Sequence, residues 1–265
     1  MNLNKQTKSS YLNELKLLKK KFVEEYSKIE LNSNMTSQQK IDEANKYNRL
    51  SNICNLVTEN LLQANRNAVK NINKELVNVY QYNYNSIAEE LKKDDINIKP
   101  IDKTESKDDI NENENPYNVI AINNATDKSS ISRNIMNTLF TSILGLASAG
   151  SAFVGLKQLY EKNLNSSIRI ATTQITRIEN LARQVAYGLA EKQAEESGRV
   201  MVKVWYSQRD DRVRDSHARA DGQEAQMDRP FYVGGEELMF PCDIGGSPEN
   251  IINCRCYIKC KFIKK

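Results

Sequence analysis

The residue types best suited to bind a metal ion gather near the C-terminal end of the chain. His217, the single histidine, precedes Cys254 and Cys256, whose Cys-x-Cys spacing places two thiols close together on a turn or strand end. Structural Zn²⁺ sites take four nitrogen or sulfur ligands in a tetrahedron, and Cys242 or Cys260 can supply the fourth. The set predicts a structural zinc site that stabilises a small module. The alternative is a buried, hydrogen-bonded histidine with unligated thiols in the core.

The same histidine can also be interpreted as a catalytic group. His217 would act as a general base, oriented by a carboxylate, while an arginine holds a phosphate. The candidate carboxylates are Asp215, Asp211 and Glu224, and the candidate arginines are Arg212 and Arg214. Such an arrangement would make the protein a nucleic-acid phosphodiesterase or a toxin-like enzyme. The alternative is a surface turn of ion pairs that positions the loop, formed by Asp210, Asp211, Arg212 and Arg214. Because a single histidine without a partner motif is weak evidence for catalysis, we expect no enzymatic activity.

Basic and aromatic residues alternate through the same region. The candidate nucleic-acid-binding residues are Arg209, Arg212, Arg214, Arg219, Arg255, Lys259 and Lys261. Trp205, Phe231 and Tyr257 lie among them. Such a surface would neutralise phosphates without reading bases, which predicts salt-sensitive binding without sequence preference. An ordinary solvated face over an aromatic core is the alternative, and the net charge of +4 permits either.

Long helices are expected to precede this region. Helical spacing of apolar residues over 8–30 and 38–92 predicts two or three long amphipathic helices. Helical spacing resumes from residue 131, with one helix through 134–164 and a second over about 166–197. The predicted fold class is therefore α+β, with long N-terminal α-helices and then a helical pair that leads into a small β-rich C-terminal module.

The β-rich module is predicted from period-two alternation and turn residues. The segment 199–207 (RVMVKVWYS) alternates as a strand does, and 256–262 resembles a final strand. Val233-Gly234-Gly235-Glu236 is typical of a hairpin turn.

Three domains follow from these patterns. We expect a helical N-terminal domain over 1–92, an acidic flexible linker over 93–130 and a C-terminal domain over 131–265. The linker is assigned because the stretch is acidic and polar, contains Pro100 and Pro116, and offers little apolar surface to bury.

Residues 134–156 contain no charged side chain and are numerous enough to span a bilayer. Polar residues dilute the stretch, however, and Gly145, Ala149 and Ala152 would allow close helix–helix contact in protein or in lipid. A buried helix of the core or of an oligomer is favoured over a membrane-entering segment.

Cysteine usage points to a reducing compartment. The chain has five cysteines, an odd number with four near the C-terminal end, which is not a secreted disulfide framework. The first twenty residues mix Lys, Glu, Asn and Gln without an apolar centre, so we expect no signal peptide and synthesis in the cytosol.

Five short segments between 205 and 256 occur in a distinctive order. They are W-Y-S-Q-R-D-D-R-V-R-D-S-H, D-G-Q, P-F-Y-V-G-G, F-P-C-D-I-G-G-S-P-E-N and N-C-R-C. In order, spacing and residue type they resemble the Mu F-like minor head proteins of tailed bacteriophages, the phage head morphogenesis family. The resemblance covers about 133–262, and it makes the C-terminal domain a Mu F-like head-morphogenesis domain.

The resemblance implies a structural virion component in the capsid interior, made in the host cytoplasm. Proteins of this kind associate with the portal protein, enter the scaffold-filled capsid in several copies, lie beside the packaged double-stranded DNA and can be ejected with the genome. A membrane-active ejection protein, in transient contact with a membrane through 134–156, is a second alternative to the enzyme.

Overall fold

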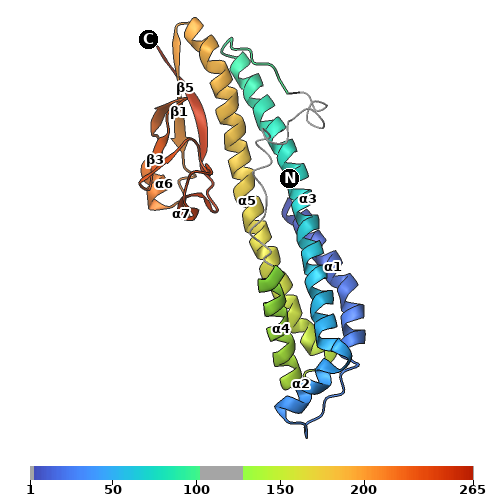
Figure 1. Ribbon diagram of the computed structural model, residues 1–265. Coiled ribbons are helices and arrows are strands. Elements are labelled where there is room, and N and C mark those ends of the chain that lie inside the picture. Colours follow the sequence, from blue (N-terminus) through green and yellow to red (C-terminus); the bar gives the residue numbers. More distant parts are fainter. Residues whose placement is uncertain (1–2, 102–127, 265) are drawn as a thin grey trace. The chain divides into compact units, whose positions relative to one another are not determined.

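The computed structural model describes residues 3–101 and 128–264 (Figure 1). The helices are α1 (Leu3–Tyr26), α2 (Ser37–Asn45), a 3-10 turn (Lys46–Asn48), α3 (Arg49–Lys92), α4 (Lys128–Leu144), α5 (Ala149–Glu196), α6 (Asp215–Ala220) and α7 (Pro248–Ile251). The strands are β1 (Arg199–Tyr206), β2 (Glu224–Gln226), β3 (Phe231–Val233), β4 (Glu236–Leu238) and β5 (Tyr257–Lys264). The predicted α+β class, with long helices before a small β-rich module, is confirmed.

The chain forms two compact units, and each of the long helices α3 and α5 contributes to both. The first unit ends at Ile72 in α3 and at Ile168 in α5, and the second begins at the following residues. The predicted domains 1–92, 93–130 and 131–265 stay predictions, and residues 102–127 of the expected linker lie outside the described part.

The first residues of the expected linker bury more surface than their composition predicts. Ile96 and Ile98 are buried. Asn97 exchanges two hydrogen bonds of 2.8 Å with the side chain of Gln193 in α5. Arg199 donates to the Asp94 carbonyl over 2.6 Å. Two isoleucines and a few backbone groups are therefore sufficient to fix a segment that is otherwise acidic.

The first unit is a helical bundle with a continuous apolar core. Its largest buried side chains include Tyr11, Leu18, Phe22, Leu50, Ile53, Leu61, Ile135, Leu139 and Leu156. The Phe22 ring lies 5.5 Å from the Phe153 ring, which joins α1 to α5. The buried Tyr11 hydroxyl lies 2.7 Å from the Ser167 hydroxyl and donates to the Asn65 side chain. These contacts explain why the apolar faces predicted for the long helices are covered within the unit.

The prediction of one helix through 134–164 is wrong. Residues 145–148 interrupt the helix, and a single second helix then continues to Glu196. Leu146 adopts a left-handed φ of 55°. The Ala147 amide bonds to the Ser142 carbonyl over 2.8 Å, the pattern of a Schellman C-cap. The Ser148 hydroxyl then accepts from the Ser151 amide over 3.2 Å and caps α5. Near residue 165 no glycine, proline or cap interrupts the turn, so the expected second break is missing.

Residues 134–156 are thus divided between two helices whose apolar residues Ile135, Leu139, Ile143 and Phe153 are buried in the first unit. This supports the interpretation of the stretch as part of the core. Within residues 3–101 and 128–264, no helix combines the length and apolar character needed to cross a membrane.

The second unit contains the predicted β-module. Strand β1 lies between β2 and β5 in an antiparallel sheet. Trp205 is paired with Ile258 across the β1–β5 ladder. The predicted hairpin is confirmed, with Gly234 and Gly235 at φ of 62° and 84° between β3 and β4. A side chain at Gly234 would also place its Cβ 2.8 Å from the Asn250 side-chain oxygen. Both its backbone angle and this close approach require glycine.

Two glycines of α5 allow the α4–α5 packing to be tested. A Cβ at Gly155 would lie 3.1 Å from the Thr138 methyl group, whereas one at Gly188 would meet nothing within 4 Å. Gly188→Ala should raise the free energy of unfolding by about 0.5–1 kcal/mol, because alanine is the better helix former. Gly155→Ala should gain clearly less or lose stability, as measured by urea denaturation. Equal gains in both variants would contradict close packing at Gly155.

Candidate functional site

One face of α5 supplies hydrogen bonds to the irregular loops of the module. The Thr173 hydroxyl accepts from the Asn253 amide over 3.0 Å, and Arg177 Nε donates to the Cys242 carbonyl over 2.7 Å. The Asn180 side chain donates to the Cys256 carbonyl over 3.0 Å and accepts from the Ile258 amide over 2.9 Å. Because these three polar residues recur at helical spacing, they form one polar stripe along the helix.

Gln184 continues the stripe by donating to the Met227 carbonyl over 2.7 Å. Thr173, Arg177 and Asn180 are themselves buried. A buried loop cannot pair its own backbone groups as a strand does, so side chains of a neighbouring helix must satisfy them. We define the anchoring stripe as Thr173, Arg177, Asn180 and Gln184.

The opposite side of the Cys254-Arg255-Cys256 loop is held by the segment after β1. Arg255 forms a two-bond ion pair with Asp210, with N···O distances of 2.7 and 2.6 Å. Gln208 donates to the Arg255 carbonyl over 2.8 Å, and the Arg214 guanidinium donates to the Ile252 carbonyl. The Arg255 hydrogen bonds hold the pKa of Asp210 well below its usual range. The loop is thus fixed from two sides.

Aromatic packing positions the His217 side chain. It lies in the short helix α6 and is buried. Its ring meets the Trp205 indole edge-on, with ring centres 5.7 Å apart and an interplanar angle of 88°. Trp205 in turn packs edge-on against Phe231, at 5.4 Å. The indole therefore limits the rotation of the imidazole and directs one ring nitrogen toward the cysteine loop.

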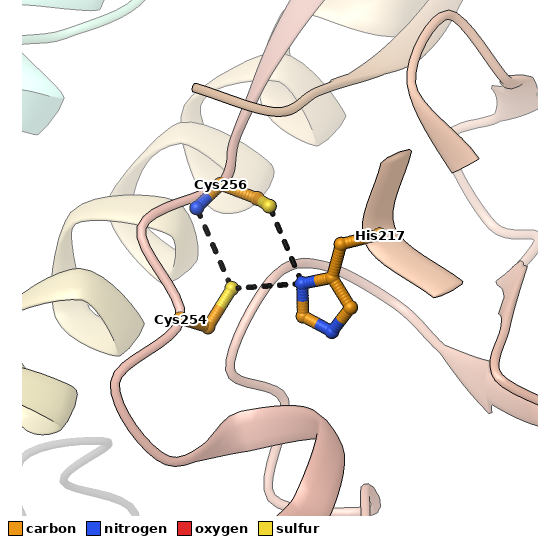
Figure 2. Close-up of side chains that lie close together, drawn as sticks. All are labelled: His217, Cys254 and Cys256. Carbon is orange, nitrogen blue, oxygen red and sulfur yellow. Dashed lines mark hydrogen bonds between the residues drawn. The ribbon is translucent and has the colours of Figure 1, made fainter. Parts of the chain in front are cut away.

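Figure 2 shows the imidazole nitrogen Nδ1 of His217 facing the sulfurs of Cys254 and Cys256. The Nδ1···Sγ distances are 3.5 Å to Cys254 and 3.4 Å to Cys256. The Cys256 amide donates to Cys254 Sγ over 3.4 Å. All three side chains are buried, and their ligand atoms lie within 4.8 Å of one another. The structure thus brings together three of the residues that the sequence proposed for a metal.

The two candidates for a fourth ligand lie outside this trio. Cys242 is buried, and its thiol donates to the Ile251 carbonyl over 3.4 Å and lies 3.9 Å from the Cys254 carbonyl. Cys260 is on β5, where burial raises the pKa of its thiol to about 11. The assignment of Cys242 as a ligand stays a prediction.

The thiols of Cys242, Cys254 and Cys256 differ in their pKa values. Hydrogen bonds from the Cys242 and Cys256 thiols, together with one from His217, lower the pKa of Cys254. Its sulfur is therefore the acceptor at the centre of the cluster. The pKa values of Cys242 and Cys256 are raised, because their protons are held by the Cys254 sulfur.

The geometry does not form the arrangement expected for general-base catalysis. Nδ1 of His217 faces two sulfurs, and Nε2 is buried without a hydrogen-bond partner among the described residues. Of the candidate carboxylates, Glu224 pairs with Lys261 over 2.7 Å. Across the described part of the chain, no carboxylate is hydrogen-bonded to the imidazole, so the ring lacks the orienting acid that the catalytic interpretation requires.

Most of the proposed nucleic-acid-binding residues have partners inside the protein. Arg209 pairs with Asp221 over 2.8 Å, and Arg212 lies 3.5 Å from Asp210. Arg255, Arg214 and Lys261 make the contacts described above. Arg219 and Lys259 are exposed. The nucleic-acid role of the seven residues stays a prediction, and their pairing supports the alternative of a solvated face of ion pairs for most of them.

Lys203 is a buried charge that sequence reasoning missed. It lies on β1, whose residues 201–205 are all buried. The Lys203 ammonium donates to the carbonyls of Met227 and Met239 over 3.2 and 2.9 Å, and to Gln184 Oε1 over 3.2 Å. The sequence around Lys203 does not indicate these three hydrogen bonds, because the acceptors lie far away in the chain.

The comparisons with known proteins agree with the resemblance noted in the sequence. Residues 147–259 match the family described as Phage Mu protein F like protein. The matched family is one of structural phage head morphogenesis proteins. No solved structure matches the chain.

The chain is also similar to part of an enzyme. It is 26% identical over 126 residues to the NAD(+)--arginine ADP-ribosyltransferase EFV of Enterococcus faecalis (strain ATCC 700802 / V583). The alignment covers 48% of this chain and 25% of that protein, so the chain spans about a quarter of the length of this relative.

The buried lysine leads to a prediction about stability. Lys203→Met removes the donor to the Met239 carbonyl and to Gln184 Oε1 and one of the two donors to the Met227 carbonyl, which should lower the free energy of unfolding by about 1–3 kcal/mol near neutral pH. The exposed Lys259 of the neighbouring strand is the matched control, and Lys259→Met should change stability by less than about 0.5 kcal/mol. Urea denaturation measures both, and equal effects would contradict the role of these hydrogen bonds.

The difference between wild type and Lys203→Met should also depend on pH. Burial lowers the pKa of Lys203 to about 8, against the opposing influence of Asp228, Asp243 and Glu191. The folded state therefore loses this proton at lower pH than the unfolded state does. Wild-type stability should rise relative to the variant as the pH increases from about 8 toward the ordinary lysine pKa of about 10.4. A constant difference across this window would show that the ammonium is not desolvated.

Proposed function

We propose that this protein is a minor head protein of the capsid interior that associates with the portal protein and remains beside the packaged DNA. The observation that carries the proposal is the family match over 147–259. The internal use of the matched residues adds support. Asp210, Arg214 and Arg255 fix one loop of the module, and Asn180 fixes it from the other side. Residues used in this way build a rigid framework, which suits a structural role in an assembly.

The absence of an orienting carboxylate at His217 in the described residues favours this function over the phosphodiesterase. The membrane-active alternative gains no support from the buried apolar residues of α4 and α5. The portal, the scaffold-filled capsid and the packaged DNA are the partners that a rigid module of this family would meet during assembly.

Virion incorporation tests the proposal. Asn180→Ala removes the amide that satisfies both the Cys256 carbonyl and the Ile258 amide, at a cost of about 1–3 kcal/mol per unsatisfied group. The matched control is Asn163→Ala in the same helix, where the amide donates only to the Leu159 carbonyl of its own helix. Mass spectrometry of purified virions should find the wild type and the control, with portal protein, and far less of the Asn180 variant. Comparing filled with emptied virions shows whether the protein leaves with the genome.

Absence of the wild-type chain from virions and from portal pull-downs would overturn the proposal. Wild-type incorporation of an Asn180→Ala protein whose module is measurably unfolded would assign assembly to the other unit instead.

Contact with DNA is expected to be weak and to depend on Arg219 and Lys259, which among the seven candidate residues are exposed and have no acidic partner in the described part of the chain. Arg219→Glu with Lys259→Glu should reduce binding to duplexes of unrelated sequence, and wild-type affinity should fall as salt rises. Lys19→Glu with Lys20→Glu, both exposed in α1, is the control of equal charge change outside the module. Binding that is insensitive to salt, or equally lost in the control, would contradict phosphate contact through these residues.

A non-catalytic role also predicts that the purified chain does not release nicotinamide from NAD⁺ in the presence of an arginine-containing acceptor. Chromatography of the reaction mixture measures this. Turnover above that of heat-denatured protein would show that the similarity to the ADP-ribosyltransferase extends to activity.

A further inference from the structure

We propose that Cys254 Sγ, Cys256 Sγ and His217 Nδ1 bind one Zn²⁺ ion, with a fourth coordination position that opens to a small cavity. The family match does not assign this site. It follows from the convergence of three buried donor atoms of the kinds that zinc prefers.

The donor distances fit a tetrahedral zinc ion. Zinc–sulfur bonds of about 2.3 Å and zinc–nitrogen bonds of about 2.05 Å at tetrahedral angles separate a sulfur from a nitrogen by about 3.5 Å. The two measured Nδ1···Sγ distances are 3.5 and 3.4 Å. Both nitrogen–sulfur separations therefore match those around a tetrahedral zinc ion.

Nδ1 of His217 cannot form a good hydrogen bond to both neighbouring sulfurs at once. A neutral imidazole offers a single lone pair or a single proton at Nδ1, so it forms one good hydrogen bond there. Both thiols nevertheless lie at contact distance from Nδ1, and all three side chains are buried away from water. One ion placed between them would satisfy every donor atom at once, which two competing S–H···N bonds cannot do.

The protein holds the ligands in place independently of any ion. The loop that carries both cysteines is fixed by Asn180 on one side and by the Asp210–Arg255 ion pair on the other. The imidazole is held by Trp205. Outer contacts of this kind orient metal ligands in known sites and increase their affinity.

The fourth position is assigned to a small exogenous ligand. All three ligand residues line a pocket of about 10 Å³, room for about one water-sized ligand, together with Gln208, Arg212 and Arg214. Cys242 does not belong to the group of mutually close donors, and its thiol hydrogen-bonds to the Ile251 carbonyl and to the Cys254 sulfur. Two thiolates neutralise Zn²⁺, and the neighbouring guanidinium groups favour water, hydroxide or a small anion at the remaining position.

Metal content of the full chain tests the proposal. Protein purified without chelator should contain about one Zn²⁺ per chain by plasma mass spectrometry. After exchange with Co²⁺ it should show the intense visible absorption of a tetrahedral thiolate site. Absence of zinc together with no uptake of Co²⁺ by the folded wild type would overturn the proposal, and this result does not depend on any variant folding.

Three variants locate the ligands. Cys254→Ser and His217→Ala should lose the bound zinc, whereas Cys260→Ser, on β5, should keep it as the matched control. Circular dichroism of each variant at low temperature checks that the helices remain. Equal zinc content in Cys254→Ser, His217→Ala and the control would overturn the assignment.

Two measurements test the open position. Cys242→Ser should keep both the zinc and the Co²⁺ spectrum, and added azide should shift the absorption of the Co²⁺-loaded wild type. Loss of zinc from Cys242→Ser, or a spectrum that azide leaves unchanged, would overturn the three-ligand site in favour of a closed one. Virion incorporation is measured separately, so failure of the metal site is distinguishable from failure of the head function.

Discussion

Backbone groups of irregular loops must be satisfied when the loops are buried, and the anchoring stripe of α5 meets this constraint. Thr173, Arg177, Asn180 and Gln184 contact the loops before β3, before α7 and before β5. Each contact replaces a hydrogen bond that a strand partner would otherwise supply. The module has short strands and long connections, so without this helix several buried amides and carbonyls would be left unpaired, each at a substantial cost.

The position of the cysteine loop follows from that constraint. Asn180 binds the backbone on both sides of Tyr257, at the point where the loop becomes β5. Asp210 binds the side chain of Arg255, between the two cysteines. With the loop held in this way, both sulfurs face the imidazole of His217. The cluster is thus a consequence of how the module is attached to its helix as well as of the residues that form it.

The ion pairs and the contacts with α5 hold the small C-terminal module together. A small module gains rigidity from internal ion pairs and helix anchors rather than from a large core. The motif arginines that look available for phosphates in the sequence are used largely for this purpose, since Arg209, Arg214 and Arg255 each contact a carboxylate or a carbonyl of the module.

The sequence by itself determined the fold class, the long amphipathic helices, strand β1, the Gly234-Gly235 turn and the family. These features depend on local periodicity, on turn residues and on ordered motifs, all of which are written along the chain. It also indicated that His217, Cys254 and Cys256 belong together.

Only the tertiary structure decided the remaining features, because they depend on partners distant in the chain. The break at Leu146 in place of one near residue 165 depends on a backbone cap that many sequences can form. Lys203 is buried because oxygens of Met227, Met239 and Gln184 converge on it. The separation of Cys242 from the trio and the pairing of Asp210 with Arg255 are likewise set by how the loops pack, which residue types and spacing do not specify.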